Sequence, residues 1–213
     1  MRALVVAKAP EPGRVKTRIG AELGMEAAAH LAAGALLDTL AVCRAAFDEC
    51  HLALAGDLGR AVEGAALRDG LRGWTVHRQR GDGLGARLAH AHADAAGPGP
   101  TVQVGMDTPQ LTAAGLRTVA DAAADGDAVL GPATDGGWWV LALSDPAAAA
   151  ALRDVPMSRP DTFARTHDAL GAAGQQVVVG PELGDVDTAA DAARVAASLG
   201  GGAFLRAWQA VGR

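Results

Sequence analysis

Cations are concentrated in one short segment near the N-terminus. Residues 8–18 contain Lys8, Arg14, Lys16 and Arg18, whereas the average density of lysine and arginine predicts about one cation in eleven residues. Ammonium and guanidinium groups are the side chains that hold phosphate oxygens. The segment therefore predicts a phosphate-binding loop, and a solvated basic loop is the alternative.

The position of this loop supports the first interpretation. It follows the predicted strand Leu4–Ala7, and ligands of open α/β sheets bind beyond the carboxyl ends of the strands. Two prolines stiffen it, and Gly13 lets backbone N–H groups approach an anion. It lacks the glycine spacings of a Walker loop and of a dinucleotide fingerprint. We expect Lys16 to act in catalysis. The expected substrate contacts are Lys8, Pro12, Gly13, Arg14, Lys16, Thr17 and Arg18.

Carboxylates occur at two later points of the chain. Asp107 comes just after the predicted strand Val102–Gly105, at the same sheet edge. Mg²⁺ or Mn²⁺ is commonly held by one or two carboxylates together with phosphates and waters, so Asp107 is a candidate metal ligand and catalytic residue. Its alternative role is a helix cap or a turn with Pro109. Asp185 and Asp187 precede a predicted helix, and either could meet the metal bound by Asp107.

Two glycine-containing segments are further candidates for substrate contacts. Asp135, Gly136 and Gly137 precede two tryptophans, a pattern that indicates close backbone approach to a ligand or, equally, a plain turn into an edge strand. A glycine-rich turn opens a later helix, whose N-terminus could receive an anion near Gly85 and Arg87. A structural role is the equal alternative for that turn.

The elements that must position these residues alternate along the chain. Short apolar or β-branched runs predict strands at Leu4–Ala7, His51–Ala55, Thr75–His77, Val102–Gly105, Ala128–Leu130, Trp138–Leu143 and Gln176–Val179. Alanine- and leucine-rich stretches predict helices at Met25–Phe47, Leu58–Leu67, Leu84–Ala96, Ala113–Ala124, Pro146–Leu152, Thr162–Ala172 and Thr188–Leu199, the last capped by Thr188. Such alternation predicts an open α/β fold with a mostly parallel sheet flanked by helices.

Bulk properties narrow the functional classes. A length of 213 residues favours one domain over 1–213, and a net charge of −5 with 3% aromatic residues argues against a nucleic-acid partner. Cys43 and Cys50 have no metal-ligand spacing and are expected to be buried free thiols. The apolar stretch 27–47 is interrupted by charged residues, so we expect a core helix, no membrane partner and a cytoplasmic protein.

The ordered set of motifs resembles one protein family. Residues 8–18, the segment around Asp107, Asp135-Gly136-Gly137 and Asp185-Val186-Asp187-Thr188 are similar to the bacterial DUF2064 family, whose members are usually labelled glycosyltransferases. They are more distantly similar to the phospholactate guanylyltransferases. The resemblance spans nearly the whole chain. Trp138 and Trp139 stand where the family usually has tyrosines, and Met106 replaces a small residue.

The resemblance implies a GT-A-like, Rossmann-type fold of the nucleotide-diphospho-sugar transferases, with an open, mixed and mostly parallel sheet. It implies that Lys16 and Arg18 lie at the phosphates of a nucleoside triphosphate or nucleotide sugar. Asp107 would be the main metal ligand, with Asp185 or Asp187 as the second. The implied activity is that of a transferase that uses Mg²⁺ or Mn²⁺.

Nucleotidyl transfer from a nucleoside triphosphate to a phosphorylated small-molecule acceptor is the leading hypothesis. A triphosphate carries more negative charge than a sugar diphosphate and so better matches the basic loop. Glycosyl transfer from a nucleotide sugar is the second hypothesis. A non-catalytic nucleotide-binding module is the third.

Overall fold

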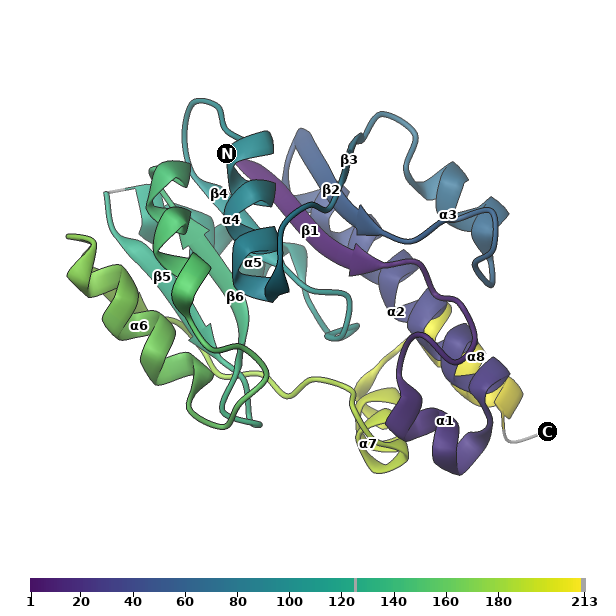
Figure 1. Cartoon of the computed structure of the whole chain (residues 1–213). Helices are drawn as coiled ribbons and strands as arrows, with labels where there is room; N and C mark the ends of the chain where they lie inside the picture. The colour runs from purple at the N-terminus through teal and green to yellow at the C-terminus, as the bar shows by residue number, and fades with distance from the viewer. Residues whose placement is uncertain (125, 212–213) are drawn as a thin grey trace.

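The protein is built on one seven-stranded sheet. The computed structural model describes residues 1–124 and 126–211 (Figure 1). Its strands are β1 (Arg2–Lys8), β2 (Glu49–Ala55), β3 (Thr75–Arg78), β4 (Thr101–Val104), β5 (Ala128–Pro132), β6 (Trp138–Leu143) and β7 (Val177–Val179). All of the predicted strands are confirmed, with ends that differ by at most two residues.

The sheet is mixed and mostly parallel. Its strand order is β3-β2-β1-β4-β6-β5-β7, and within this sheet only β6 runs antiparallel to its neighbours. Leu4 of β1 lies opposite His51 of β2 and Gln103 of β4. The carboxyl ends of β1, β2, β3 and β4 therefore meet at one edge, where the sequence predicts the ligand.

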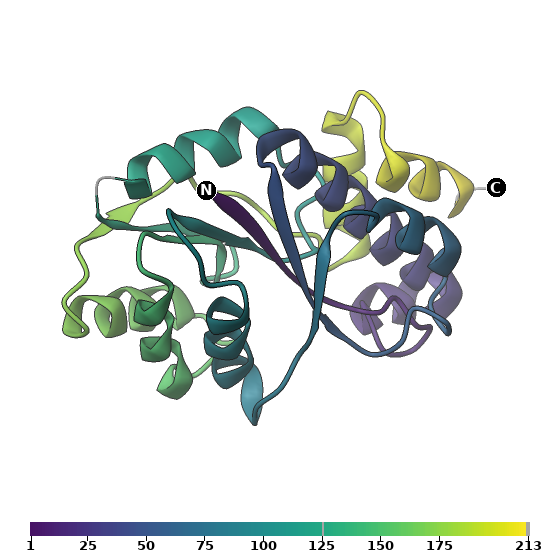
Figure 2. The same cartoon turned by 90° about the horizontal axis from the view of Figure 1, so that it is seen from above.

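Helices cover both faces of the sheet (Figure 2). The helices are α1 (Thr17–Leu23), α2 (Met25–Ala46), α3 (Gly64–Gly70), α4 (Gly83–Asp94), α5 (Ala113–Ala124), the 3₁₀ helix η1 (Pro146–Asp154), α6 (Thr162–Ala172), α7 (Ala189–Ser198) and α8 (Ala203–Val211). Helices α2 and α5 pack on one face, and α4, η1 and α6 pack on the other. The arrangement confirms the predicted α/β architecture.

Alternation along β1 explains how its two faces are buried. Ala3, Val5 and Ala7 point into the cluster that contains α2 and α5, and Leu4 points into the cluster of α4. All four side chains are at most 3% exposed. An uninterrupted apolar run is the pattern expected of a parallel strand that is covered on both faces.

Helix α2 is the long apolar helix that the sequence predicts for the core. By length and composition alone this helix could cross a membrane. In the fold, however, 61% of its apolar 18-residue window is buried inside the protein. It contacts β1, β2, α3, α5 and α8. Cys43 on this helix and Cys50 on β2 are both buried free thiols, as expected, and burial raises the pKa of each.

Three differences from the predicted helices have local causes. The helix expected at Leu58–Leu67 begins only at Gly64, because a turn in which Asp57 accepts a 2.7 Å hydrogen bond from the Gly59 amide precedes it. Residues 146–154 form a 3₁₀ helix that begins with Pro146. Helix α1 begins at Thr17, near the end of the expected loop 8–18, and continues to Leu23 through a segment for which no element was predicted.

Helix α8 was not predicted, because no capping residue precedes it in the sequence. Its cap comes from α2: the Asp38 carboxylate accepts hydrogen bonds from the amides of Ala203 (2.7 Å) and Phe204 (2.9 Å). Phe204, 1% exposed, then packs with Leu31 of α2 and Val195 of α7. A cap that lies 165 residues away leaves no local signal for a helix start.

Candidate functional site

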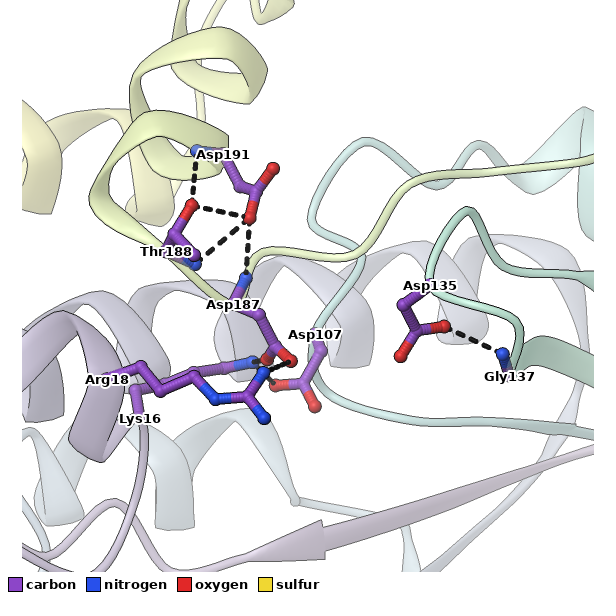
Figure 3. Close-up of polar contacts among 8 residues, drawn as sticks. All are labelled: Lys16, Arg18, Asp107, Asp135, Gly137, Asp187, Thr188 and Asp191. Carbon is purple, nitrogen blue, oxygen red and sulfur yellow. Dashed lines mark hydrogen bonds and ion pairs between the residues drawn. The ribbon is translucent and has the colours of Figure 1, made fainter. Parts of the chain in front are cut away.

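Lys16 joins two carboxylates from distant parts of the chain (Figure 3). Its Nζ lies 2.8 Å from Oδ1 of Asp107 and 2.9 Å from Oδ1 of Asp187. The Lys16 side chain is 10% exposed, whereas those of Asp107 and Asp187 are 42% and 36% exposed. The structure therefore brings together three of the predicted site residues around one buried ammonium group.

The two carboxylates favour the charged form of Lys16. Burial alone would lower the pKa of Lys16, but attraction to Asp107 and Asp187 outweighs burial and raises it. Arg18 adds a second cation, with Nη1 3.3 Å from Oδ2 of Asp187, and its side chain is 76% exposed. Lys16 is therefore an inner, buried cation of the site and Arg18 an outer one.

Local backbone geometry turns Lys16 toward the acids. Lys16 adopts the left-handed conformation (φ 47°, ψ 44°) at the residue before α1, and its carbonyl accepts a 2.8 Å hydrogen bond from Gly20. Such a conformation is uncommon for a residue with a Cβ and persists where the surroundings enforce it. Helix α1 supplies those surroundings, because Ile19 is fully buried with Leu31 and Val186.

Backbone pairing aligns the acid-bearing segments. The Val186 amide donates a 2.9 Å hydrogen bond to the Asp107 carbonyl, and the Gln110 side-chain amide donates to the Gly184 carbonyl. Val186 itself is 2% exposed, so its neighbours Asp185 and Asp187 are held on either side of a buried anchor. The carboxylates are thereby positioned by the main chain.

A second group of acids shares Asp187. One carboxylate oxygen each from Asp135, Asp185 and Asp187 lies within 4.8 Å of the other two. Burial raises the pKa of Asp185 to about 6, and repulsion by Asp187 and Asp135 adds to that effect. Asp135 comes from the turn after β5, where its Oδ1 accepts a 2.8 Å hydrogen bond from the Gly137 amide. Both of the acids left open as the second metal ligand therefore lie at the site.

The segment after the acids carries the predicted helix cap. The Thr188 hydroxyl accepts a 3.2 Å hydrogen bond from the Asp191 amide, and the Asp191 carboxylate accepts one of 3.0 Å from the Thr188 amide. This capping box confirms the role predicted for Thr188 at the start of α7. It also fixes the direction in which the chain leaves Asp187.

The other members of the basic loop face solvent. Lys8, Arg14 and Thr17 are exposed, as are Pro12 and Gly13. Gly13 has φ +75°, a left-handed conformation that glycine adopts at no cost. The Arg14 guanidinium makes only a loose ion pair of 4.0 Å with Glu11 among the described residues. Among the described side-chain contacts, none of these residues pairs with Asp107 or Asp187.

A groove beside the loop contains residues that were not among the candidates. It has a volume of about 590 Å³ at the carboxyl ends of β2 and β3. It is lined by Glu11, Arg14, Leu54, Gly56, Asp57, Arg60, Val76, His77 and Arg78. The available signal was positional: Glu11 and Arg14 follow the first strand, and the other lining residues end or follow the second and third strands, at the edge where Asp107 follows the fourth.

Gly136 serves internal packing. A Cβ on Gly136, which has φ +87°, would lie 2.0 Å from the Pro160 carbonyl oxygen, and the Gly136 carbonyl accepts a 2.9 Å hydrogen bond from Phe163. The close approach expected for a ligand is thus made by the protein's own backbone. The Trp139 indole that follows also hydrogen-bonds within the protein, donating to the Pro181 carbonyl at 2.8 Å.

The turn at the start of α4 has a similar structural explanation. A Cβ on Gly85 would lie 2.1 Å from the Leu152 carbonyl oxygen, so this glycine allows α4 and η1 to pack closely. Arg87 donates from Nε to the Gly81 carbonyl at 3.2 Å. Neither residue contacts Lys16 or the acids among the described contacts, and the structural alternative for both is favoured.

The donor set fits a hard divalent cation. Carboxylate oxygens are the ligands that Mg²⁺ and Mn²⁺ prefer, and this edge offers those of Asp107, Asp135, Asp185 and Asp187. The Lys16 ammonium already stands as a cation between two of them. A site of this composition can neutralise phosphate charge and hold a phosphate ester in place.

One known family of proteins matches this chain. The sequence pattern of a family described as "Uncharacterized protein conserved in bacteria (DUF2064)" matches residues 38–159. No curated protein matches the chain significantly.

Several solved structures share its fold. A Desulfovibrio desulfuricans G20 protein, provisionally named a nucleotide-diphospho-sugar transferase, is 25% identical with a TM-score of 0.81, and the match covers 99% of this chain and 97% of that one. A nucleotidyl transferase from Methanothermobacter is 23% identical with a TM-score of 0.56, over 97% and 98%. The Mycobacterium tuberculosis H37Rv protein Rv0371c, solved with manganese, is 23% identical with a TM-score of 0.52, over 92% and 97%.

Proposed function

The chain belongs to the DUF2064 family of bacterial proteins, and we propose that it transfers a nucleotidyl group from a nucleoside triphosphate to a phosphorylated small molecule. Its structural neighbours are transferases that include nucleotidyl transferases and a nucleotide-diphospho-sugar transferase. Those neighbours support nucleotide transfer in general. The choice of a triphosphate donor is our inference from the residues of this chain.

The observation that carries the proposal is the meeting of Lys16, Asp107 and Asp187 at one sheet edge. A buried ammonium group and two carboxylates, with a basic loop on one side, form a site for a metal–phosphate complex. Nucleophilic catalysis would need a group such as a histidine-activated serine. The described contacts of these acids include no such group. Catalysis at this edge would therefore rest on positioning and charge neutralisation.

Each part of the donor has a corresponding part of the site. Asp107 and Asp187 would hold a divalent cation, with Asp185 and Asp135 beside them. When bound, the cation would neutralise phosphate charge and polarise the reacting phosphorus centre. Lys16 and Arg18 would orient the phosphates. The groove lined by Asp57, Arg60 and His77 would take the nucleoside.

The abundance of exposed cations favours a triphosphate over a sugar diphosphate. Lys8, Arg14 and Arg18 lie on the loop, and Arg60 and Arg78 lie along the groove, all of them exposed. A departing pyrophosphate carries more charge than the phosphates of a nucleotide sugar, so it gains more from these groups. In this reaction the acceptor oxygen attacks the α-phosphorus in line and pyrophosphate leaves.

Glycosyl transfer from a nucleotide sugar is the second candidate. The structural similarity to the Desulfovibrio desulfuricans protein favours it, since that protein is named for nucleotide-diphospho-sugar transfer. The same metal and cations would stabilise a departing nucleoside diphosphate. The two reactions therefore differ in their released product.

Product analysis separates the candidates. Purified protein is incubated with each nucleoside triphosphate or nucleotide sugar, Mg²⁺ and a panel of phosphorylated acceptors, and pyrophosphate and nucleoside diphosphate are measured. Release of pyrophosphate that is lost in Asp107→Ala supports nucleotidyl transfer. Asp168→Ala, at an 84% exposed side chain paired only with His167 at 3.6 Å among described residues, is the matched control. Release of nucleoside diphosphate alone would move the assignment to glycosyl transfer.

Binding without turnover has its own signature. Thermal stabilisation by nucleotide and Mg²⁺, with no released product across the panel, would indicate a nucleotide-binding module. No stabilisation by any nucleotide, with or without Mg²⁺, would contradict the proposed function as a whole.

A further inference from the structure

Lys16 contacts one oxygen of each of the two carboxylates that are proposed to hold a divalent cation. Its ammonium contacts Oδ1 of Asp107 at 2.8 Å and Oδ1 of Asp187 at 2.9 Å (Figure 3). With 10% of its side chain exposed, Lys16 is the most buried of the three residues. A cation that the chain supplies itself thus already offsets part of the negative charge of the acid pair.

Two cations cannot share this position. An ammonium and a divalent ion that contact the same pair of oxygens would lie within a few ångströms of each other, where repulsion in a partly buried site is strong. Entry of a metal between Asp107 and Asp187 therefore requires the Lys16 ammonium to move. A buried ammonium that loses both partners is costly unless it gains another anion.

The phosphate of the ligand is the anion that can receive it. We propose that Lys16 is a resident counter-cation, which holds Asp107 and Asp187 in the ligand-free protein and passes to a phosphate when a divalent metal takes its place. The metal and the phosphate-bearing ligand then assist each other's binding. The phosphate draws Lys16 away from the oxygens that the metal takes, and the metal frees Lys16 to bind the phosphate. The proposal rests on the proposed function in its choice of a metal and a phosphate ligand.

Arg18 provides an internal comparison. It also contacts Asp187, through Oδ2 at 3.3 Å, but its side chain is 76% exposed and it does not touch Asp107 among the described contacts. Removing Arg18 deletes one positive charge near the acids without vacating the shared oxygens. Variants of Lys16 and Arg18 therefore distinguish two effects: vacating the shared carboxylate oxygens, and removing one positive charge near them.

The first experiment measures metal affinity in the absence of any phosphate. Binding of Mn²⁺ is followed by isothermal titration in the wild-type protein, Lys16→Met and Arg18→Gln. We expect Lys16→Met to bind Mn²⁺ at least tenfold more tightly than wild type, and Arg18→Gln to change the affinity less than threefold. Equal effects of the two variants, or no gain in Lys16→Met, would overturn the proposal.

The second experiment uses the intact wild-type chain, so that it does not depend on the folding of a variant. Lys8 and Lys16 are the only lysines in the sequence, so lysine labelled with ¹³C and ¹⁵N gives two side-chain signals, assigned with Lys8→Arg. Saturating Mg²⁺ should shift the Lys16 signal and leave that of exposed Lys8 unchanged. An unchanged Lys16 signal while Mg²⁺ binds would refute displacement.

The phosphate half of the proposal is tested with inorganic pyrophosphate as the probe. Wild type should bind pyrophosphate at least tenfold more tightly with saturating Mg²⁺ than without it, and this ratio should fall by at least threefold in Lys16→Met. A ratio that is the same in both proteins would overturn the transfer of Lys16 to phosphate. Failure of the proposed function would be distinguishable from failure of this proposal. The protein would then turn over no nucleotide, while Mn²⁺ binding and the Lys16 signal would still behave as expected here.

Discussion

The amide of Val186 donates a 2.9 Å hydrogen bond to the carbonyl of Asp107, which joins two segments that are far apart in the sequence. Because this bond is made by the backbone, it does not depend on the charge of the neighbouring carboxylates. The acids of the site can therefore be altered one at a time without releasing the segments that carry them. This independence makes the acid pair suitable for a double-mutant cycle.

Neutralising the two acids should be strongly non-additive. Asp107→Asn and Asp187→Asn should each lower the free energy of unfolding by about 1 kcal/mol, because Lys16 keeps one carboxylate partner. The double variant should lose about 4 kcal/mol, because the ammonium, 10% exposed, is then left without an ionised partner at hydrogen-bond distance. Urea unfolding at pH 7 measures all four proteins. A double variant that equals the sum of the singles would show that Lys16 is not held by the pair.

The groove cations should contribute to nucleotide affinity. Arg60→Gln should weaken nucleoside triphosphate binding about tenfold at low salt, since the exposed guanidinium on the groove wall acts at long range. The effect should shrink as salt is raised. Arg72→Gln is the matched control, because Arg72 is 81% exposed, pairs with Asp69 at 2.9 Å and does not line the groove. Equal losses in both variants would remove the groove from the binding site.

The sequence predicts the sheet well because each strand has a local signal. The apolar runs at residues 4–7, 51–55 and 138–143 are buried strands whose pattern needs no information from elsewhere in the chain. The convergence of Lys16 and Asp107 follows from the same source, since both come after parallel strands whose ends meet at one edge. These features can be read from short stretches of the sequence, and they predict where the residues lie in the fold.

The remaining features depend on contacts that local patterns do not encode. The start of α8 depends on Asp38 of another helix, and the glycines Gly85 and Gly136 depend on carbonyls that approach from Leu152 and Pro160. A glycine signals that some group comes close, but not whether that group is a ligand or the protein's own backbone. The ion pair of Lys16 with both acids is likewise visible only in three dimensions.

Gly136 should be intolerant of any side chain. Gly136→Ala places a Cβ 2.0 Å from the Pro160 carbonyl oxygen at φ +87°, and should destabilise the protein by about 3 kcal/mol through combined clash and backbone strain. Gly171→Ala lies within α6, where no atom outside the adjoining helix backbone is within 4 Å of the new Cβ, and should instead stabilise the protein by about 0.5–1 kcal/mol. Thermal unfolding of both variants checks the pair. A mild effect of Gly136→Ala would mean that the turn after β5 moves readily.

His92 should make the fold sensitive to mild acid. It is fully buried on α4, with Nε2 3.0 Å from Oε1 of Gln103, and burial lowers its pKa from 6.5 to about 4. Below pH 6.5 the unfolded chain takes up a proton that folded His92 does not, so the stability contributed by neutral His92 is lost as the pH falls from 6.5 toward 4. The loss attributable to His92 between pH 7 and pH 5 should be about 2 kcal/mol.

The variant that isolates this effect is His92→Gln, which keeps an amide donor for Gln103 and does not titrate. Urea unfolding of both proteins at pH 7 and pH 5 gives, for each protein, the loss of unfolding free energy over this range. The amount by which the two losses differ is due to His92, since the other histidines are common to both proteins. His92→Gln should lose less stability than wild type over this range. Parallel losses in the two proteins would mean that His92 takes up its proton in the folded state, and therefore that water reaches the ring between α4 and β4.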